Sequence, residues 1–182
     1  MRITAKNFCF MAAFVLTFES YAQAQSDSFI PLAVTEPRNA AVGFALTQAQ
    51  FVNTLLGTCA RLDEGMSESS KLTWSNWQAR NWSHVEAARG WLQYVRALIS
   101  SKNGQEAGAS FQSKTIAEIG ANARTTLLDI FPGGEPQAAA CNQWLGLLSD
   151  PRIDLRASKE FGRDLDDILA FHRAVTEHAK SR

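Results

Sequence analysis

Residues 85–99 read VEAARGWLQYVRALI and contain the clearest amphipathic helix of the chain. Apolar residues recur there at alternating steps of three and four, at Val85, Ala88, Leu92, Val95 and Ile99. This spacing places them on one face of an α-helix. The helix should end before Asn103-Gly104, because glycine is common just past a helix C-terminus. The stretch therefore predicts a helix whose apolar face packs against other helices.

Four further segments show the same period. Their inward positions are Phe51, Leu55, Cys59 and Leu62; Ile116, Ile119, Ala123, Leu127 and Ile130; Ala138, Cys141, Leu145 and Leu148; and Phe161, Leu165, Ile168, either Phe171 or His172, and Val175. Thr47 and Gln50 fit a capping box, and residues 63–70 are expected to form a loop. Whether residues 72–81 join the helix at 85–99 is left open. With no strand pattern, the sequence predicts an all-α fold, a single bundle of about five helices.

The first 24 residues have the composition of an export signal. Arg2 and Lys6 make the start positive, residues 8–18 are apolar, and Ala22-Gln23-Ala24 fits a cleavage site. The apolar run is shorter than the roughly 20 residues that a helix needs to span a bilayer. We therefore expect residues 1–24 to be a cleaved signal peptide.

The rest of the chain is expected to have two parts. Residues 25–46 contain Pro31 and Pro37 among scattered polar residues, which predicts an extended lead-in. Residues 47–182 hold the periodic segments and predict one helical domain with its own core. No later apolar run predicts stable membrane insertion, so the expected location is the periplasm or, alternatively, the cell exterior.

Export also decides how the cysteines are interpreted. Cys9 lies within the predicted signal, which leaves Cys59 and Cys141, both on apolar helix faces. Two cysteines in an oxidising compartment favour a disulfide. Such a bond would close a loop of about 80 residues and contribute about 4–5 kcal/mol in the chain-entropy model. The alternative is two free thiols, although the chain has no CxxC motif.

The charge of the chain excludes one class of partner. The 18 basic and 18 acidic residues balance, and loss of residues 1–24 removes Arg2, Lys6 and Glu19, for a net charge of about −1. A nucleic-acid-binding surface needs an excess of basic residues. We therefore expect no nucleic acid as partner.

Motifs of the common enzyme classes are absent, including GxSxG, HExxH and the phosphate-binding glycine loops. His84-Val85-Glu86 matches half of a zinc deaminase motif, but the P-C-x-x-C half is missing. The densest carboxylate group is interpreted as a solvated face paired with Arg156 and Arg163. Its members are Glu160, Asp164, Asp166 and Asp167. The sequence thus predicts no catalytic residue, no metal site and no cofactor.

Four of the five tryptophans fall between residues 74 and 91, and two interpretations of this cluster stay open. The rings could fill the bundle core, or they could form an exposed interface with neighbouring polar residues. Tryptophan, tyrosine and arginine dominate protein–protein hot spots, and aromatic rings also stack on sugars. The candidate interface residues are Trp74, Trp77, Arg80, Trp82, Arg89 and Tyr94.

We therefore expect an exported, non-enzymatic module that binds an unidentified protein partner in the cell envelope. In general type the chain resembles small bacterial periplasmic proteins, among them immunity proteins that block secreted cell-wall amidases and secretion-system accessory proteins. That resemblance implies no residue roles. One alternative is a small molecule or glycan bound between helices, and another is an enzyme of unfamiliar type. An exposed surface from Trp74 to Tyr94 would favour a protein partner, whereas a cavity lined by the tryptophans would favour a ligand.

Overall fold

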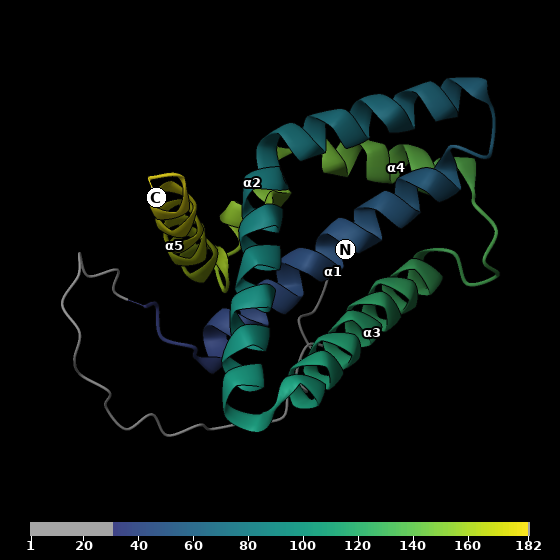
Figure 1. Cartoon of the computed structure of the whole chain (residues 1–182). Helices are drawn as coiled ribbons and strands as arrows, with labels where there is room; N and C mark the ends of the chain where they lie inside the picture. The colour runs from purple at the N-terminus through teal and green to yellow at the C-terminus, as the bar shows by residue number, and fades with distance from the viewer. Residues whose placement is uncertain (1–30, 182) are drawn as a thin grey trace.

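A computed structural model describes residues 31–181 of the chain, and these residues form helices without any strand (Figure 1). The five α-helices are α1 (Glu36–Cys59), α2 (Glu64–Asn103), α3 (Gln105–Ile130), α4 (Ala138–Leu148) and α5 (Gly162–Lys180). Two short 3-10 helices, η2 (Pro151–Ile153) and η3 (Leu155–Ala157), connect α4 to α5. The predicted all-α bundle of about five helices is confirmed. The predicted signal peptide at 1–24 lies outside the described residues, as do residues 25–30 of the predicted lead-in.

The first helix begins earlier than the sequence pattern indicated. α1 starts at Glu36 rather than near Thr47, so the expected extended lead-in to residue 46 and the capping box are wrong. Thr35 is the N-cap, and its hydroxyl accepts a hydrogen bond from the backbone N–H of Arg38 at 3.5 Å. Pro37 lies in the first turn, where a missing N–H removes no helical hydrogen bond. The proline therefore starts the helix instead of preventing it.

The expected loop at residues 63–70 is also wrong, because α2 begins at Glu64 and continues for 40 residues. Asp63 caps it by accepting a hydrogen bond from the backbone N–H of Met66 at 2.8 Å. Residues 72–81 thus belong to the same helix as residues 85–99. Figure 1 shows that α2 changes direction along its length. Near its middle, the amide of Asn81 donates to the carbonyl of Trp77 one turn earlier, and such bonds often accompany helix bends.

α1 is the central helix, since it contacts α2, α3, α4 and α5. The sequence of α1 is rich in alanine and aliphatic residues. Half of its positions are buried, and they lie on more than one face of the helix. α3 is the least buried of the long helices, with only Gly108, Thr115 and Ala123 buried. Gly108 lets α3 approach α2 closely, because a Cβ there would overlap with Ser100 and lie 2.9 Å from the carbonyl of Arg96. The bundle therefore has a firmly packed centre and a more exposed third helix.

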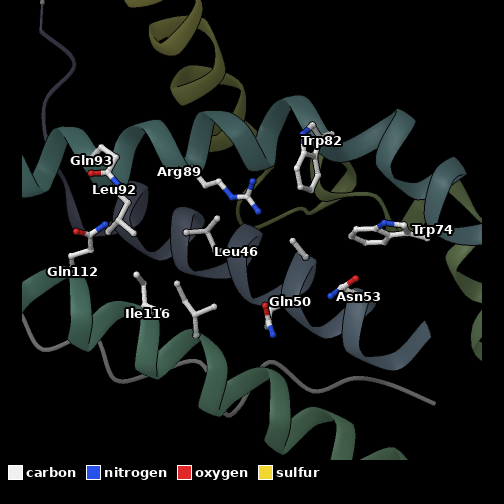
Figure 2. Close-up of a pocket in the computed structure, with 12 residues that line it drawn as sticks. Leu46, Gln50, Asn53, Trp74, Trp82, Arg89, Leu92, Gln93, Gln112 and Ile116 are labelled. Atoms are coloured by element: carbon white, nitrogen blue, oxygen red, sulfur yellow. The ribbon is translucent and has the colours of Figure 1, made fainter. Parts of the chain in front are cut away.

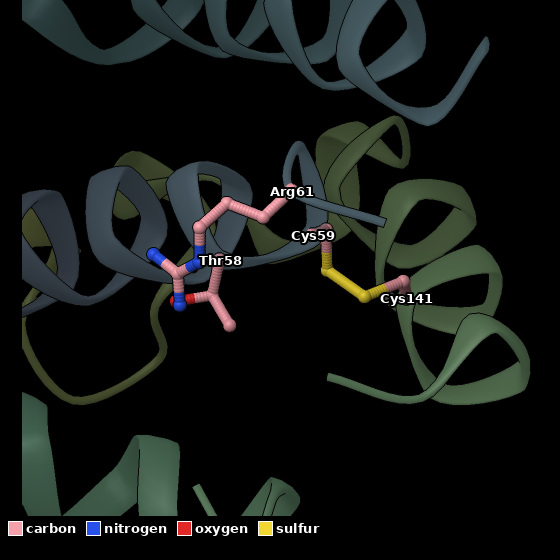
Figure 3. Close-up of a disulfide and its surroundings, with 4 residues drawn as sticks. All are labelled: Thr58, Cys59, Arg61 and Cys141. Atoms are coloured by element: carbon pink, nitrogen blue, oxygen red, sulfur yellow. A yellow bond between two sulfur atoms is a disulfide. The ribbon is translucent and has the colours of Figure 1, made fainter. Parts of the chain in front are cut away.

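The predicted disulfide is confirmed. Cys59, the last residue of α1, is bonded to Cys141 in α4, and both are fully buried (Figure 3). The bond joins residues 82 positions apart in the sequence. α4 buries only Cys141 and Leu148, although Trp144 also packs edge-on against Phe51 of α1 at 5.4 Å. The disulfide is therefore a main attachment of α4 to the bundle.

Candidate functional site

The six candidate interface residues lie in three different places. Trp77 and Arg80 attach α2 to the chain that follows α4, Tyr94 packs against α5, and the other three line a groove. Neither the core interpretation nor the interface interpretation of the tryptophan cluster therefore holds for all of its members. Part of the cluster is core and part is surface.

Trp77 and Arg80 belong to a buried contact that we call the α2 joint, formed with Asn81, Leu148, Asp154 and Leu155. The indole of Trp77 is only 2% exposed, so it belongs to the core rather than to an interface. Arg80 donates from Nε to the carboxylate of Asp154 at 2.8 Å and from its terminal nitrogen to the carbonyl of Leu148 at 2.7 Å. Its guanidinium is thus already engaged within the fold.

Asn81 completes the α2 joint, and it is 1% exposed. Its amide nitrogen donates to the carbonyl of Trp77 and to the carboxylate of Asp154, both at 3.0 Å. Its amide oxygen accepts the backbone N–H of Leu155 at 2.8 Å. Both of its N–H donors are therefore satisfied, as a buried amide requires. Sequence reasoning missed this role of Asn81, because Asp154 and Leu155 are more than 70 positions away.

Tyr94 lies on another part of α2, where it joins an aromatic cluster with α5. Its ring centroid is 5.4 Å from that of Trp91 and 5.1 Å from that of Phe171. Burial of the ring raises the pKa of the Tyr94 phenol. Tyr94 therefore helps α5 to pack and is separate from the groove.

The remaining three candidates, Trp74, Trp82 and Arg89, line a groove of about 460 Å³ between α1, α2 and α3 (Figure 2). We call it the tryptophan groove. Ligand sites in proteins commonly enclose about 300–1,000 Å³. The other lining residues are Leu46, Ala49, Gln50 and Asn53 from α1, Leu92 and Gln93 from α2, and Gln112, Ile116 and Ile119 from α3.

The aromatic residues of the tryptophan groove hold one another in place. Trp74 stacks on the buried Trp77 with centroids 5.5 Å apart and an interplanar angle of 8°. Trp82 is nearly perpendicular to Trp74, at 6.4 Å and 81°. The guanidinium carbon of Arg89 lies 4.7 Å from the centre of the Trp82 ring. Because the rings rest on the core and on each other, the aromatic wall is preorganised.

The rest of the lining divides into carboxamides and aliphatic groups. Within residues 31–181, the side chains of Gln50, Asn53, Gln93 and Gln112 form no hydrogen bond to protein that would occupy them. Leu46, Leu92, Ile116 and Ile119 supply the aliphatic part. Among the described residues of the lining none is acidic, and the one cationic residue, Arg89, pairs with Glu86 outside the lining at 2.7 Å. The groove is consequently close to neutral.

The carboxylates of α5 are engaged in contacts between helices. Arg38 of α1 lies 3.4 Å from the carboxylate of Asp167 and 3.9 Å from that of Asp164. Asp166 contacts Nε2 of the buried His84 at 3.0 Å and Arg156 at 3.6 Å. The expected pairing of Asp167 with Arg163 is thus replaced by a partner on α1. These contacts attach α5 to α1 and α2, and none of these residues lines the tryptophan groove.

Across the described residues, 31–181, no group of three or more His, Cys, Asp or Glu side chains is placed to hold a metal ion. In the same part of the chain, no helix is long and apolar enough to cross a membrane.

No protein-family model, curated protein or solved structure matches this chain. The tryptophan groove is therefore interpreted from the chemistry of its own residues.

Proposed function

We propose that the protein is an exported, non-enzymatic binding module that holds its ligand in the tryptophan groove. The observation that carries the proposal is the lining of this groove. Two indoles and a guanidinium line one concave site together with an aliphatic wall and four carboxamides that form no side-chain hydrogen bond within residues 31–181. An apolar pocket with a few convergent polar groups is the usual form of a ligand site.

Two features support export. The chain carries the signal-like residues 1–24, and Cys59 and Cys141 form a disulfide. Disulfides persist in oxidising compartments such as the periplasm and the cell exterior. The periplasm is the proposed location, and secretion is the alternative.

The distribution of the cluster favours a groove ligand over a flat protein interface. Trp77 and Arg80, the centre of the expected interface, are occupied by the α2 joint. The residues that remain available, Trp74, Trp82 and Arg89, face a concave surface. Preformed concave sites suit a ligand that enters them more than a broad flat partner.

A protein partner remains the second candidate, as in an inhibitor or immunity-like role. The observation that favours it is the apolar surface of α3, where Ile116 is 54% exposed at the groove and Leu128 is 50% exposed. A partner could insert a segment into the groove and cover this surface.

The proposal is tested by retention from the envelope fraction of the source cells. The immobilised oxidised protein is compared with a Trp82→Ala/Arg89→Ala variant, which removes the two groove side chains. The matched control is Leu72→Ala/Arg173→Ala, since both residues are exposed and neither lines the groove. The bound material is separated into protein, glycan and small-molecule pools.

We expect a component that the wild-type protein and the control retain and that the groove variant loses. Thermal unfolding of all three proteins verifies that the variants are folded. Equal retention by the groove variant, or retention of nothing by any of the proteins, would contradict the proposal.

A further inference from the structure

We infer that the tryptophan groove binds an uncharged glycan chain that carries N-acetyl groups. This inference rests on the proposed function and specifies the class of its ligand. Three kinds of side chain in the groove support it, namely indoles, carboxamides and aliphatic groups, and the charge of the groove supports it as well.

The indoles are the first kind. The C–H face of a sugar ring is apolar and packs on an aromatic face, while its hydroxyls point sideways. Trp74 has one face covered by Trp77, so the stack with Trp77 supports the ring from behind. Trp82 stands nearly perpendicular to it. Arg89 covers one face of Trp82, so Trp82 would contact a sugar through its other face or its edge. Because the two rings lie in different planes, they can contact neighbouring sugar units of a twisted chain.

The carboxamides are the second kind. Gln50, Asn53, Gln93 and Gln112 come from three different helices and line the groove, with Gln50 and Asn53 nearer Trp74 and with Gln93 and Gln112 at the other end, beside Leu92 and Ile116 (Figure 2). A carboxamide both donates and accepts hydrogen bonds, so it matches a hydroxyl or an acetamido group in either orientation. Their lack of protein partners within residues 31–181 leaves these bonds available to a ligand.

The aliphatic wall is the third kind, and it indicates the N-acetyl group. Leu92 and Ile116 face the groove from α2 and α3, beside Gln93 and Gln112 of the same helices (Figure 2). An acetamido substituent combines a methyl group with an amide. Such a substituent would place its methyl on the aliphatic wall and its amide against the carboxamides, which a plain hydroxyl cannot do.

The charge of the groove is the fourth argument. Arg89 is neutralised by Glu86 and lies over Trp82, and none of the lining residues within 31–181 is acidic. A strongly anionic ligand would have to compete with Glu86 for Arg89, the one cation that the described residues contribute to the lining. A cationic ligand would find no carboxylate among the lining residues that the structure describes. An uncharged ligand is therefore the best match, and its binding should vary little with salt.

An α-helical peptide fits the groove less well, because its backbone groups are already bonded internally. Such a helix would cover the carboxamides and leave their donors and acceptors without partners, which is costly. An extended peptide could satisfy them, and the experiment separates this possibility from a glycan.

The test is calorimetric titration of the oxidised protein with three tetrasaccharides. The probes are the β-1,4-linked tetramer of N-acetylglucosamine, the same tetramer without its acetyl groups, and the β-1,4-linked tetramer of glucose. We expect the N-acetylated tetramer to bind about tenfold or more tightly than either of the others, with little change between low and high salt.

Two variants locate the interaction. Trp82→Ala should weaken binding of the N-acetylated tetramer by about tenfold or more, as loss of a central aromatic contact does. Ile116→Ser should reduce the preference for the N-acetylated tetramer over the glucose tetramer. Its matched control is Leu128→Ser, because Leu128 is equally exposed on α3 but does not line the groove.

Several results would overturn the inference. These are failure of the N-acetylated tetramer to bind, equal binding of the three tetramers, or unchanged binding by Trp82→Ala. If the retention experiment instead yields a polypeptide that the groove variant loses, the binding module stands and the glycan is wrong. If nothing depends on the groove residues in either experiment, both proposals fail.

Discussion

The α2 joint and the tryptophan groove use similar residues of one helix for opposite purposes. Asn81 and Trp82 are consecutive, so their side chains point about 100° apart around the helix. Asn81 is buried against the chain after α4, while Trp82 is half-buried at the groove. Each site also has one arginine, and the two arginines differ in the same way. Arg80 binds Asp154 across the fold, whereas Arg89 binds Glu86 on its own helix.

The comparison teaches that residue type alone does not separate a structural role from a binding role. What differs is whether the side chain contacts a group that is distant in the sequence or one that is close to it. Side chains that contact groups distant in sequence hold the fold together, and their loss leaves buried polar groups unpaired. Side chains with only local contacts stay available to a ligand. Trp74 connects the two sites, because it stacks on Trp77 and also meets Trp82.

The largest expected effect comes from the disulfide that attaches α4, the helix whose Leu148 carbonyl receives Arg80. A Cys59→Ala/Cys141→Ala variant should lose about 4–5 kcal/mol of unfolding free energy, because an 82-residue separation gives a large loop-closure entropy. Urea denaturation measures this. Reduction of the wild-type protein should produce a similar loss. A loss below about 1 kcal/mol would mean that packing, without the disulfide, is enough to hold α4 and its Leu148 at the α2 joint.

The next effect compares the two tryptophans directly. Trp77→Ala should cost about 3–5 kcal/mol, because it empties a fully packed core position. Trp82→Ala should cost roughly 1–2 kcal/mol, since its ring is only half-buried. Denaturant midpoints of the two variants check the difference. Equal losses would remove the distinction between the α2 joint and the tryptophan groove.

Asn81→Ala should cost about 2–3 kcal/mol, because it removes the partner of the Leu155 N–H and one of the two donors to an Asp154 oxygen, which keeps Arg80. Groove binding should survive in this variant wherever it remains folded. The matched control is Asn76→Ala on the exposed side of α2, which should change stability by less than about 0.5 kcal/mol. Similar values for both variants, from thermal or urea unfolding, would contradict a structural role for Asn81.

The smallest effects separate the two arginines. Arg80→Ala should cost about 1–2 kcal/mol, since it removes the donor to the Leu148 carbonyl and the ion pair with Asp154, which keeps only the Asn81 amide as a donor. Arg89→Ala should cost less than about 1 kcal/mol, because its ion pair with Glu86 is exposed and local. Ligand binding should show the reverse order, with the larger loss in Arg89→Ala. Calorimetric titration and urea unfolding of both variants test this reversed order. If the two variants lose equal stability and equal affinity, the predicted difference between the arginines is wrong.

Parts of the fold that depend on local periodicity could be predicted from the sequence. The helix at residues 138–148 appeared where its apolar spacing placed it, and Cys59 and Cys141 faced inward. The helix expected at residues 116–130 is present, but it begins earlier than its apolar stripe indicated, at Gln105. The first half of α2 was missed for a physical reason. Its buried stripe continues through Ser70, Thr73, Asn81 and His84, and these polar residues interrupt a pattern that is recognised by hydrophobicity.

The sequence predicted some residues of the candidate site and missed the others. Trp74, Trp82 and Arg89 were among the candidates and do share a groove, but its other walls come from α1 and α3. Residues such as Gln50 and Gln112 carry no sequence signal of a binding role, because surface glutamines are common on any helix. Only their positions relative to the tryptophans make them part of a site.

The sequence by itself determined that this chain forms an all-α bundle closed by one disulfide, since helix periodicity and the number of cysteines are local or countable properties. Only the tertiary structure decided which tryptophans are buried and which line the groove. The reason is that burial depends on what packs against a side chain. For Arg80 and Asn81 the decisive neighbours lie at Leu148, Asp154 and Leu155, far along the chain.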